Sequence, residues 1–345
     1  MDYTTITKSS LYQNQVLYTG TGSEQAITGV GFQPDMVWQK GRSTGTSPSI
    51  HDAVRGSTWE IYTSNTSADA NYAQTCKSFD SDGFTVGTDG GWNGSGQTKV
   101  GWCWKANGSG SANTDGNVTT TVSANTTPGF SILKFTGTDT GGQTIGHGLG
   151  KKPRLYITKN LSEADNWMCW FDTTGNGTSD KRLILNSTNA DYGNYPCTFN
   201  TDTITLPATS DNAWNGTGDT IIGYCFAEIS GFSKFGSYIG NNGGSDGVFV
   251  YTGFKPQFVM IKLSSHTGAN WNIRDTKRDT YNPMDNVLRA NLNDAETDMA
   301  DIDYLSNGFK TRANGLNQQD NGYTYSYMAF GQTLVGTNNI PATAR

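Results

Sequence analysis

One stretch of the chain, residues 31–40 (GFQPDMVWQK), decides the fold because it returns twice. It recurs as residues 152–159 (KPRLYITK) and as residues 253–262 (GFKPQFVMIK). In each copy a proline precedes an alternating run of residues that ends in lysine. Alternation is typical of a β-strand, and a segment that recurs at a long, regular interval indicates an internal repeat. The sequence therefore predicts three copies of one structural unit.

Two further landmarks keep nearly the same distance from this proline in all three copies. The first is a single aspartate, which is Asp52, Asp172 or Asp275. The second is an aromatic closing strand, at residues 102–105 (WCWK), 224–227 (YCFA) and 327–330 (YMAF). A weaker match lies between them, at residues 83–86 (GFTV), 203–206 (TITL) and 308–311 (GFKT). Matched spacing of several landmarks supports the threefold repeat.

Composition points to an all-β protein with more than one domain. Glycine occupies 43 positions and aromatic residues make up 12% of the chain, while only 16% of its residues are charged. Aromatic and β-branched residues between glycine and asparagine clusters are typical of short strands joined by tight turns. Each unit has the strand spacing of a β-sandwich or jelly roll, and two packed sheets are favoured over a barrel. A length of 345 residues exceeds what one hydrophobic core usually fills.

The landmarks divide the chain into three tandem β-sandwich domains, two connections and two arms. The predicted segments are an N-terminal arm (1–15), sandwich one (16–106), a low-complexity linker (107–128), sandwich two (129–230), a connector (231–247), sandwich three (248–330) and a C-terminal arm (331–345). The linker is polar and low in complexity, so we expect it to join its neighbours flexibly or to lie over a surface.

Charge and cysteine content exclude several classes of protein. The net charge is −6 and the pI is near 5.0, which disfavours a nucleic acid or an anionic membrane as partner. The sequence shows neither a signal peptide nor an apolar run long enough to cross a bilayer. The cysteines are odd in number and lack C-x-x-C spacing, which predicts free, mostly buried thiols rather than disulfides or a zinc site. They are Cys76, Cys103, Cys169, Cys197 and Cys225.

No residue pattern predicts catalysis, cofactor binding or metal binding. The repeated aspartate lacks a repeated base or second carboxylate, so we expect it to cap a turn or pair at a strand end. The histidines, His51, His147 and His266, do not occupy equivalent positions, and none lies in a nucleophile motif. No glycine-rich loop has the context of a nucleotide site. The prediction is a protein that is not an enzyme, and nothing points to a polysaccharide-degrading carboxylate pair.

A tryptophan motif supplies the one candidate binding site. Trp92 and Asn93 lie in WNGSG, and Trp214 and Asn215 lie in the matching WNGTG. If the two indole rings were exposed, they could stack on sugar rings while the asparagines donate hydrogen bonds to hydroxyls. The alternative, which the position just before a closing strand favours, is that each tryptophan packs into its own sandwich.

The motifs resemble those of a known but uncharacterised domain. Five of them carry the resemblance: residues 18–20 (YTG), 31–40 (GFQPDMVWQK), 51–56 (HDAVRG), 79–87 (FDSDGFTVG) and 101–106 (GWCWKA). They look like a domain found in structural proteins of marine tailed bacteriophages, and the ending 340–345 (IPATAR) is similar to the tail of such proteins. The resemblance is strong in the first unit and loose in the others. It implies a virion component with a lectin-like sandwich fold.

The expected function follows from this resemblance. It is a structural protein on the virion surface, a capsid decoration or a tail or fibre component, that contributes to particle stability or host attachment. Expected partners are other virion proteins, further copies of the chain and a host cell-surface glycan, and synthesis is expected in the bacterial host cytoplasm. The sequence lacks the heptads of a long fibre shaft. The alternative function is a soluble multivalent carbohydrate-binding module, similar to a lectin.

Overall fold

Antiparallel β-sheet makes up nearly all of the regular structure in the computed structural model, which describes residues 4–299, 301–313, 315 and 317–333. Three large sheets each pair with a three-stranded sheet. The all-β, sandwich-type fold predicted from the sequence is confirmed. We call the three sheet pairs units one, two and three, in chain order.

Each unit consists of one large sheet and one small, three-stranded sheet. Unit one has a six-stranded sheet of β1 (Gln13–Thr19), β9 (Thr98–Trp104), β3 (Met36–Gly41), β4 (Ser49–Asp52), β5 (Gly56–Tyr62) and β6 (Ala70–Asn71), and a small sheet of β2 (Gln25–Thr28), β8 (Gly83–Val86) and β7 (Cys76–Asp80). Unit two has a seven-stranded sheet of β10 (Ser111–Asn113), β11 (Thr120–Asn125), β12 (Phe130–Thr136), β19 (Thr220–Ala227), β14 (Pro153–Asn160), β15 (Met168–Phe171) and β16 (Lys181–Ile184), and a small sheet of β13 (Thr144–Gly146), β18 (Thr203–Thr205) and β17 (Thr198–Phe199). Unit three has a six-stranded sheet of β20 (Ser233–Ile239), β28 (Thr324–Thr333), β22 (Phe254–Leu263), β23 (Asn272–Asp275), β24 (Asn286–Arg289) and β25 (Thr297–Asp298), and a small sheet of β21 (Phe249–Tyr251), β27 (Gly308–Thr311) and β26 (Ile302–Leu305). The described helices are short: η1 (Ser9–Leu11), α1 (Gly90–Asn93), α2 (Asn212–Asn215) and η2 (Gly244–Asp246).

The motif strands lie side by side at the middle of each large sheet. The proline-led segments are β3, β14 and β22, and the closing strands are β9, β19 and β28. Each proline-led strand pairs antiparallel with the closing strand of its own unit. Five strands of each large sheet have a matching order, which is β1-β9-β3-β4-β5 in unit one, β12-β19-β14-β15-β16 in unit two and β20-β28-β22-β23-β24 in unit three.

These middle strands are buried on both faces, as unit one illustrates. Val37 and Cys103 point toward the small sheet and pack with Phe84 of β8 in a core that belongs to unit one alone. Trp38 and Trp102, their chain neighbours, point the opposite way because successive strand residues alternate between faces. All six residues of β3 are therefore buried. A strand covered on both faces need not alternate apolar with polar residues.

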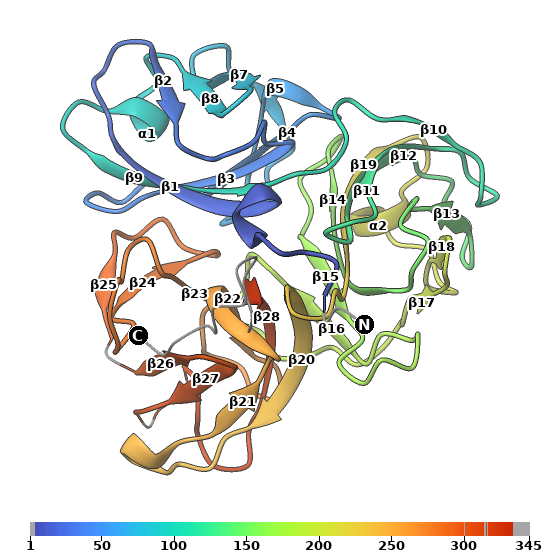
Figure 1. Cartoon of the computed structure of the whole chain (residues 1–345). Helices are drawn as coiled ribbons and strands as arrows, with labels where there is room; N and C mark the ends of the chain where they lie inside the picture. Colours follow the sequence, from blue (N-terminus) through green and yellow to red (C-terminus); the bar gives the residue numbers. More distant parts are fainter. Residues whose placement is uncertain (1–3, 300, 314, 316, 334–345) are drawn as a thin grey trace.

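The second face of each large sheet contributes to one central core that the three units share. Figure 1 shows the units arranged around a common centre. The ring of Trp104 in unit one lies 6.5 Å from that of Phe226 in unit two. The same ring lies 5.5 Å and 5.8 Å from those of Phe258 and Phe330 in unit three. The three units are therefore not separate bodies, because their large sheets pack against one another in this core while each unit also keeps a core of its own.

Both predicted connections contain strands. Residues 107–128, predicted as a low-complexity linker, include β10 and β11, which extend the large sheet of unit two. Residues 231–247, predicted as a connector, include β20, which pairs along its length with β28. These two predictions are wrong because β10 and β11 join the sheet through backbone hydrogen bonds that a polar sequence also provides, whereas β20 buries Phe235 and Tyr238 in the cores.

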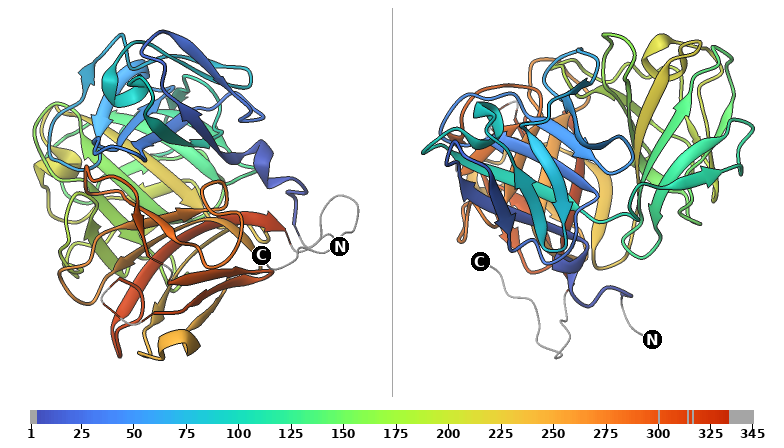
Figure 2. Two further views of the ribbon diagram at one scale, coloured as in Figure 1. Left: turned by 90° about the vertical axis from the view of Figure 1, so that its left-hand side faces the viewer. Right: turned by 90° about the horizontal axis from the view of Figure 1, so that it is seen from above.

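The two ends of the described chain meet at one side of the molecule. Residues 1–15 were predicted as an arm, yet Ile6 lies in the central core and β1 begins at Gln13. The Ser9 hydroxyl donates to Gln332 Oε1 (2.9 Å), and Gln332 Nε2 donates to the Thr7 carbonyl (3.3 Å). The start of the described chain thus packs against the end of β28, as Figure 2 shows. Of the predicted C-terminal arm, residues 334–345 lie outside the described residues.

Candidate functional site

The repeated aspartates cap turns, as predicted, and two of them also bind a neighbouring unit. Asp52 accepts backbone hydrogen bonds from Val54 and Arg55, and its Oδ2 lies 2.6 Å from Arg55 Nε. Asp275 holds Arg278 in the same way, at 2.5 Å. Asp172 accepts from glycine amides and from a threonine hydroxyl instead. All three aspartates are buried.

Aromatic donors from the next unit complete the two aspartate–arginine pairs. The Tyr224 hydroxyl of unit two donates to Asp52 Oδ2 (2.8 Å), and Trp102 Nε1 of unit one donates to Asp275 Oδ2 (2.9 Å). Burial, followed by the nearby Asp52 carboxylate, raises the pKa of Tyr224 well above its ordinary value. At the matching register the third closing strand carries Met328, whose thioether cannot donate a hydrogen bond. Two of the three boundaries therefore have a buried polar link of the same design.

The lysines that end the proline-led strands also lie at the boundaries. Lys40 Nζ donates to the Leu292 carbonyl of unit three (2.6 Å), and Lys262 Nζ donates to the Thr188 carbonyl of unit two (3.2 Å). Lys159 Nζ instead donates within unit two, to the Asn160 and Glu163 carbonyls. Burial lowers the pKa of each of the three amines to about 8.

These lowered values predict a pH effect on stability that one variant isolates. The folded state loses the Lys262 proton near pH 8, whereas the unfolded chain keeps it to about 10.5. Because the unfolded state then binds more protons, stability rises as pH increases through this interval. We expect the unfolding free energy of the wild type to rise relative to that of Lys262→Met between pH 8 and 10.5. The slope is at most about 1.4 kcal/mol per pH unit.

Chemical denaturation of both proteins across this pH range measures the difference. Thiols and tyrosines that titrate in the same range are common to the two proteins, so their contributions cancel. Lys277→Met, which removes an exposed lysine, is the control and should give no such slope. A difference that is constant with pH would contradict the lowered pKa of Lys262.

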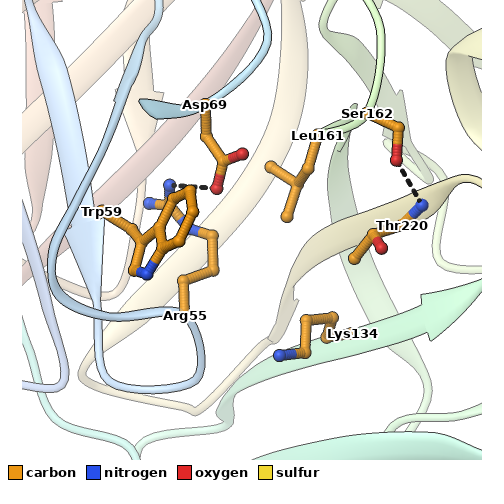
Figure 3. Close-up of a pocket in the computed structure, with 7 residues that line it drawn as sticks. All are labelled: Arg55, Trp59, Asp69, Lys134, Leu161, Ser162 and Thr220. Carbon is orange, nitrogen blue, oxygen red and sulfur yellow. Dashed lines mark hydrogen bonds and ion pairs between the residues drawn. The ribbon is translucent and has the colours of Figure 1, made fainter. Parts of the chain in front are cut away.

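A pocket of about 300 Å³ opens at the boundary between units one and two. Figure 3 shows its walls. Unit one supplies Arg55 from the turn after β4, Trp59 from β5 and Asp69 from the residue before β6. Unit two supplies the rest of the wall: Lys134 from β12, Leu161 and Ser162 from the turn after β14, and Thr220 from the start of β19.

The polar groups of the pocket are incompletely paired. Arg55 Nη1 lies 3.5 Å from Asp69 Oδ2, and among the described residues it has no hydrogen-bond partner although its side chain is only 2% exposed. Lys134 Nζ makes one long contact, to the Val54 carbonyl at 3.4 Å. Burial raises the pKa of Asp69, and the Arg55 charge opposes that rise. Arg55 Nη1 is itself buried and ion-paired with Asp69, so the donor that borders the cavity with spare hydrogen-bonding capacity is Lys134 Nζ.

The corresponding place between units three and one is filled by an ion pair. The Arg42 guanidinium binds Glu296 with both carboxylate oxygens within 3.2 Å, and Glu296 in turn binds Arg278. Arg42 and Leu161 are equivalent, since each follows its strand lysine by two residues and each amide donates to the carbonyl of the first residue of β9 or β19. Because Leu161 cannot form such an ion pair, the pocket between units one and two is not filled in this way.

The sequence-predicted binding residues are buried rather than exposed. Trp92 and Trp214 are each 1% exposed and pack into the cores of units one and two. Trp92 Nε1 donates to Glu60 Oε1 (2.7 Å), and both residues border a second pocket, of about 250 Å³. Asn93 and Asn215 hold neighbouring loops through hydrogen bonds that their side-chain amides both donate and accept. Each tryptophan therefore packs into its own unit, as its position before the closing strand favoured, and neither ring is exposed for stacking on a sugar.

The cysteines and the acidic and histidine side chains form no further site in the described part of the chain. All five cysteines are free and buried, as predicted. The described part of the chain has no group of three or more histidine, cysteine, aspartate or glutamate side chains placed to hold a metal ion. Within the same part, no helix has the length and apolar character needed to cross a membrane.

The chain matches the model of a known domain family. Residues 8–333 match the model of a domain of unknown function, DUF7483. The chain belongs to this family. No curated protein and no solved structure matches it. DUF7483 carries no assigned activity, so the geometry of this member must support any functional proposal.

Sequence reasoning missed the boundary pocket of this DUF7483 chain. Its wall joins Arg55 and Trp59 to Lys134 and Thr220, which are far apart in the sequence. One signal was available, because the first and middle copies differ at Arg42 and Leu161 beside otherwise similar strands. Without knowledge that the units share a core, that difference gave no reason to expect a cavity.

Proposed function

We propose that the chain is a non-enzymatic structural protein on the surface of a tailed-phage particle, as a capsid decoration or a tail or fibre component. There it would contribute to particle stability or to host attachment. The observation that carries the proposal is the arrangement of the ends. Ser9 near the start of the described chain and Gln332 near its end are hydrogen-bonded to each other on one side of the molecule. Attachment through that side would leave the opposite loops free to face outward.

The shared core and the buried thiols suit a protein that is made in a cell and then persists outside it. A single central core joins the three sheet pairs, so local opening of one unit exposes the inner faces of the others. All five thiols are buried. Buried thiols react slowly with oxidants, so the protein can fold in a reducing cytoplasm and persist in oxidising surroundings. These properties support a particle component that needs no disulfides.

The alternative, a soluble carbohydrate-binding module, is not proposed through Trp92 and Trp214, because both rings are buried. We also propose that the chain associates with other virion proteins and with further copies of itself.

The test is co-purification with particles. An antibody raised against the folded chain is used on gradient-purified particles from a lysate of the producing host, by blotting and by immunogold electron microscopy. We expect a fixed number of copies per particle and gold labelling at one structural location. A chain that stays in the soluble fraction and labels no particle would overturn the proposal.

A further inference from the structure

We propose that the pocket between units one and two binds an acidic sugar, a pyranose ring that carries a carboxylate. The pocket is defined by Arg55, Trp59, Asp69, Lys134, Ser162 and Thr220. This inference concerns a ligand of the purified chain, so it does not depend on the proposed place on a particle.

Trp59 differs from the other tryptophans in the exposure of its ring. Eight of the nine tryptophans are almost completely buried: Trp38, Trp92, Trp102, Trp104, Trp167, Trp170, Trp214 and Trp271. Trp59 is 37% exposed, and it lies on the wall of the pocket. Leaving an indole ring in water costs hydrophobic free energy that burial elsewhere would recover. A flat aromatic surface beside a cavity can instead stack on the apolar face of a sugar ring.

The charged groups favour a ligand with a carboxylate. Among the described residues, Arg55 Nη1 has only its long ion pair with Asp69 (3.5 Å), and Lys134 Nζ has one hydrogen bond at 3.4 Å. Lys159 also lies close enough to lower the pKa of Asp69, so three cations stand beside the carboxylates of Asp52 and Asp69 at this boundary. Charge-assisted hydrogen bonds to a carboxylate are roughly twice as strong as neutral ones. A ligand carboxylate would give Lys134 Nζ a charged acceptor in place of its long contact to the Val54 carbonyl.

The opposite wall and the size of the pocket suit sugar hydroxyls. Ser162 Oγ accepts a hydrogen bond from the Thr220 amide (2.9 Å), which leaves the serine hydroxyl proton free to donate. Thr220 contributes a second hydroxyl to the same wall. A volume of about 300 Å³ lies at the lower end of the range for ligand sites, which fits one or two sugar rings. Inorganic phosphate would satisfy the cations but would make no use of the indole ring.

The experiment is a titration of the full chain, followed by isothermal calorimetry and by ligand-observed NMR. The probes are methyl glucuronide, methyl glucoside and inorganic phosphate. We expect the glucuronide to bind about tenfold more tightly than the glucoside, a difference that one charge-assisted contact can provide. Trp59→Ala should weaken both sugars by about tenfold, which is within the range of aromatic stacking. Lys134→Gln should remove the preference for the acidic sugar.

Leu161→Arg gives the sharpest test, because it places at this boundary the residue that fills the equivalent site as Arg42. We expect it to pair with Asp69 and abolish glucuronide binding. Tyr281→Ala, which removes an exposed ring outside the pocket, is the matched control and should bind as the wild type does. If Leu161→Arg does not fold, Trp59→Ala and Lys134→Gln decide the matter, since they alter only partly exposed side chains.

Three outcomes would overturn the proposal. The first is no binding of the glucuronide to the wild type at millimolar concentration. The second is equal binding of glucuronide and phosphate that Trp59→Ala leaves unchanged, which would indicate a general anion site. The third is equal binding of the two methyl glycosides, which would show that the cations of the pocket do not contribute to ligand binding.

Discussion

Replacement of Asp52 by alanine is expected to lower the free energy of unfolding by about 3–5 kcal/mol, the range for breaking one partner of a buried ion pair. The Arg55 side chain is only 2% exposed, so without Asp52 its charge has only the more distant Asp69. The Tyr224 hydroxyl, which donates to Asp52 across the boundary, loses its acceptor as well. Urea denaturation monitored by circular dichroism measures the change.

Asp172→Ala is the matched control, because the Asp172 carboxylate occupies the same position in unit two but accepts from backbone amides and a threonine hydroxyl rather than from an arginine. Its loss frees only turn amides and a hydroxyl, for which we expect a cost of about 1–2 kcal/mol. The double variant Asp52→Asn with Arg55→Met should lose less stability than Asp52→Ala alone, because no unpaired cation remains. An Asp52→Ala protein that is as stable as Asp172→Ala would show that the boundary network contributes nothing beyond turn capping.

The second large effect is expected at Trp104, which touches all three units. Its ring is 1% exposed and lies within 6.5 Å of the rings of Phe226, Phe258 and Phe330. Trp104→Ala leaves a cavity in the central core and should cost about 3–5 kcal/mol. Because the cavity borders every unit, hydrogen exchange should become faster in β9, β19 and β28 together. Hydrogen exchange followed by mass spectrometry measures each strand separately.

A milder substitution at the same site provides the control. Trp104 Nε1 has no hydrogen-bond partner among the described residues, so Trp104→Phe removes volume without breaking a polar contact. We expect a cost of about 1–2 kcal/mol, with the same distribution over the three closing strands. Faster exchange confined to unit one in either variant would mean that the core of each unit is independent.

The sequence predicted individual strands better than their assembly. The proline-led and closing segments form strands because their β-branched and aromatic residues suit a pleated, buried surface. The turn-capping role of Asp52 was also predictable, since an aspartate before a tight turn accepts from the backbone two and three residues on. The packing of the three large sheets against one another could not be predicted from the sequence, because contacts such as that of Trp104 with Phe330 join residues far apart in the chain.

Polar composition caused the main errors. Residues 107–128 look like a linker because they bury few side chains, but β11 gains its place through backbone pairing with β12. The WNG motifs look like exposed turns, yet the aspartates just before them, Asp89 and Asp211, cap short helices that turn Trp92 and Trp214 inward. The candidate pocket could not be predicted, because it depends on which units are neighbours.

Scanning calorimetry of the wild-type chain tests most directly whether the three sheet pairs form one body with a shared core. A shared core predicts a single transition whose calorimetric enthalpy equals its van't Hoff enthalpy. Three resolved transitions, or a calorimetric enthalpy near three times the van't Hoff value, would contradict it.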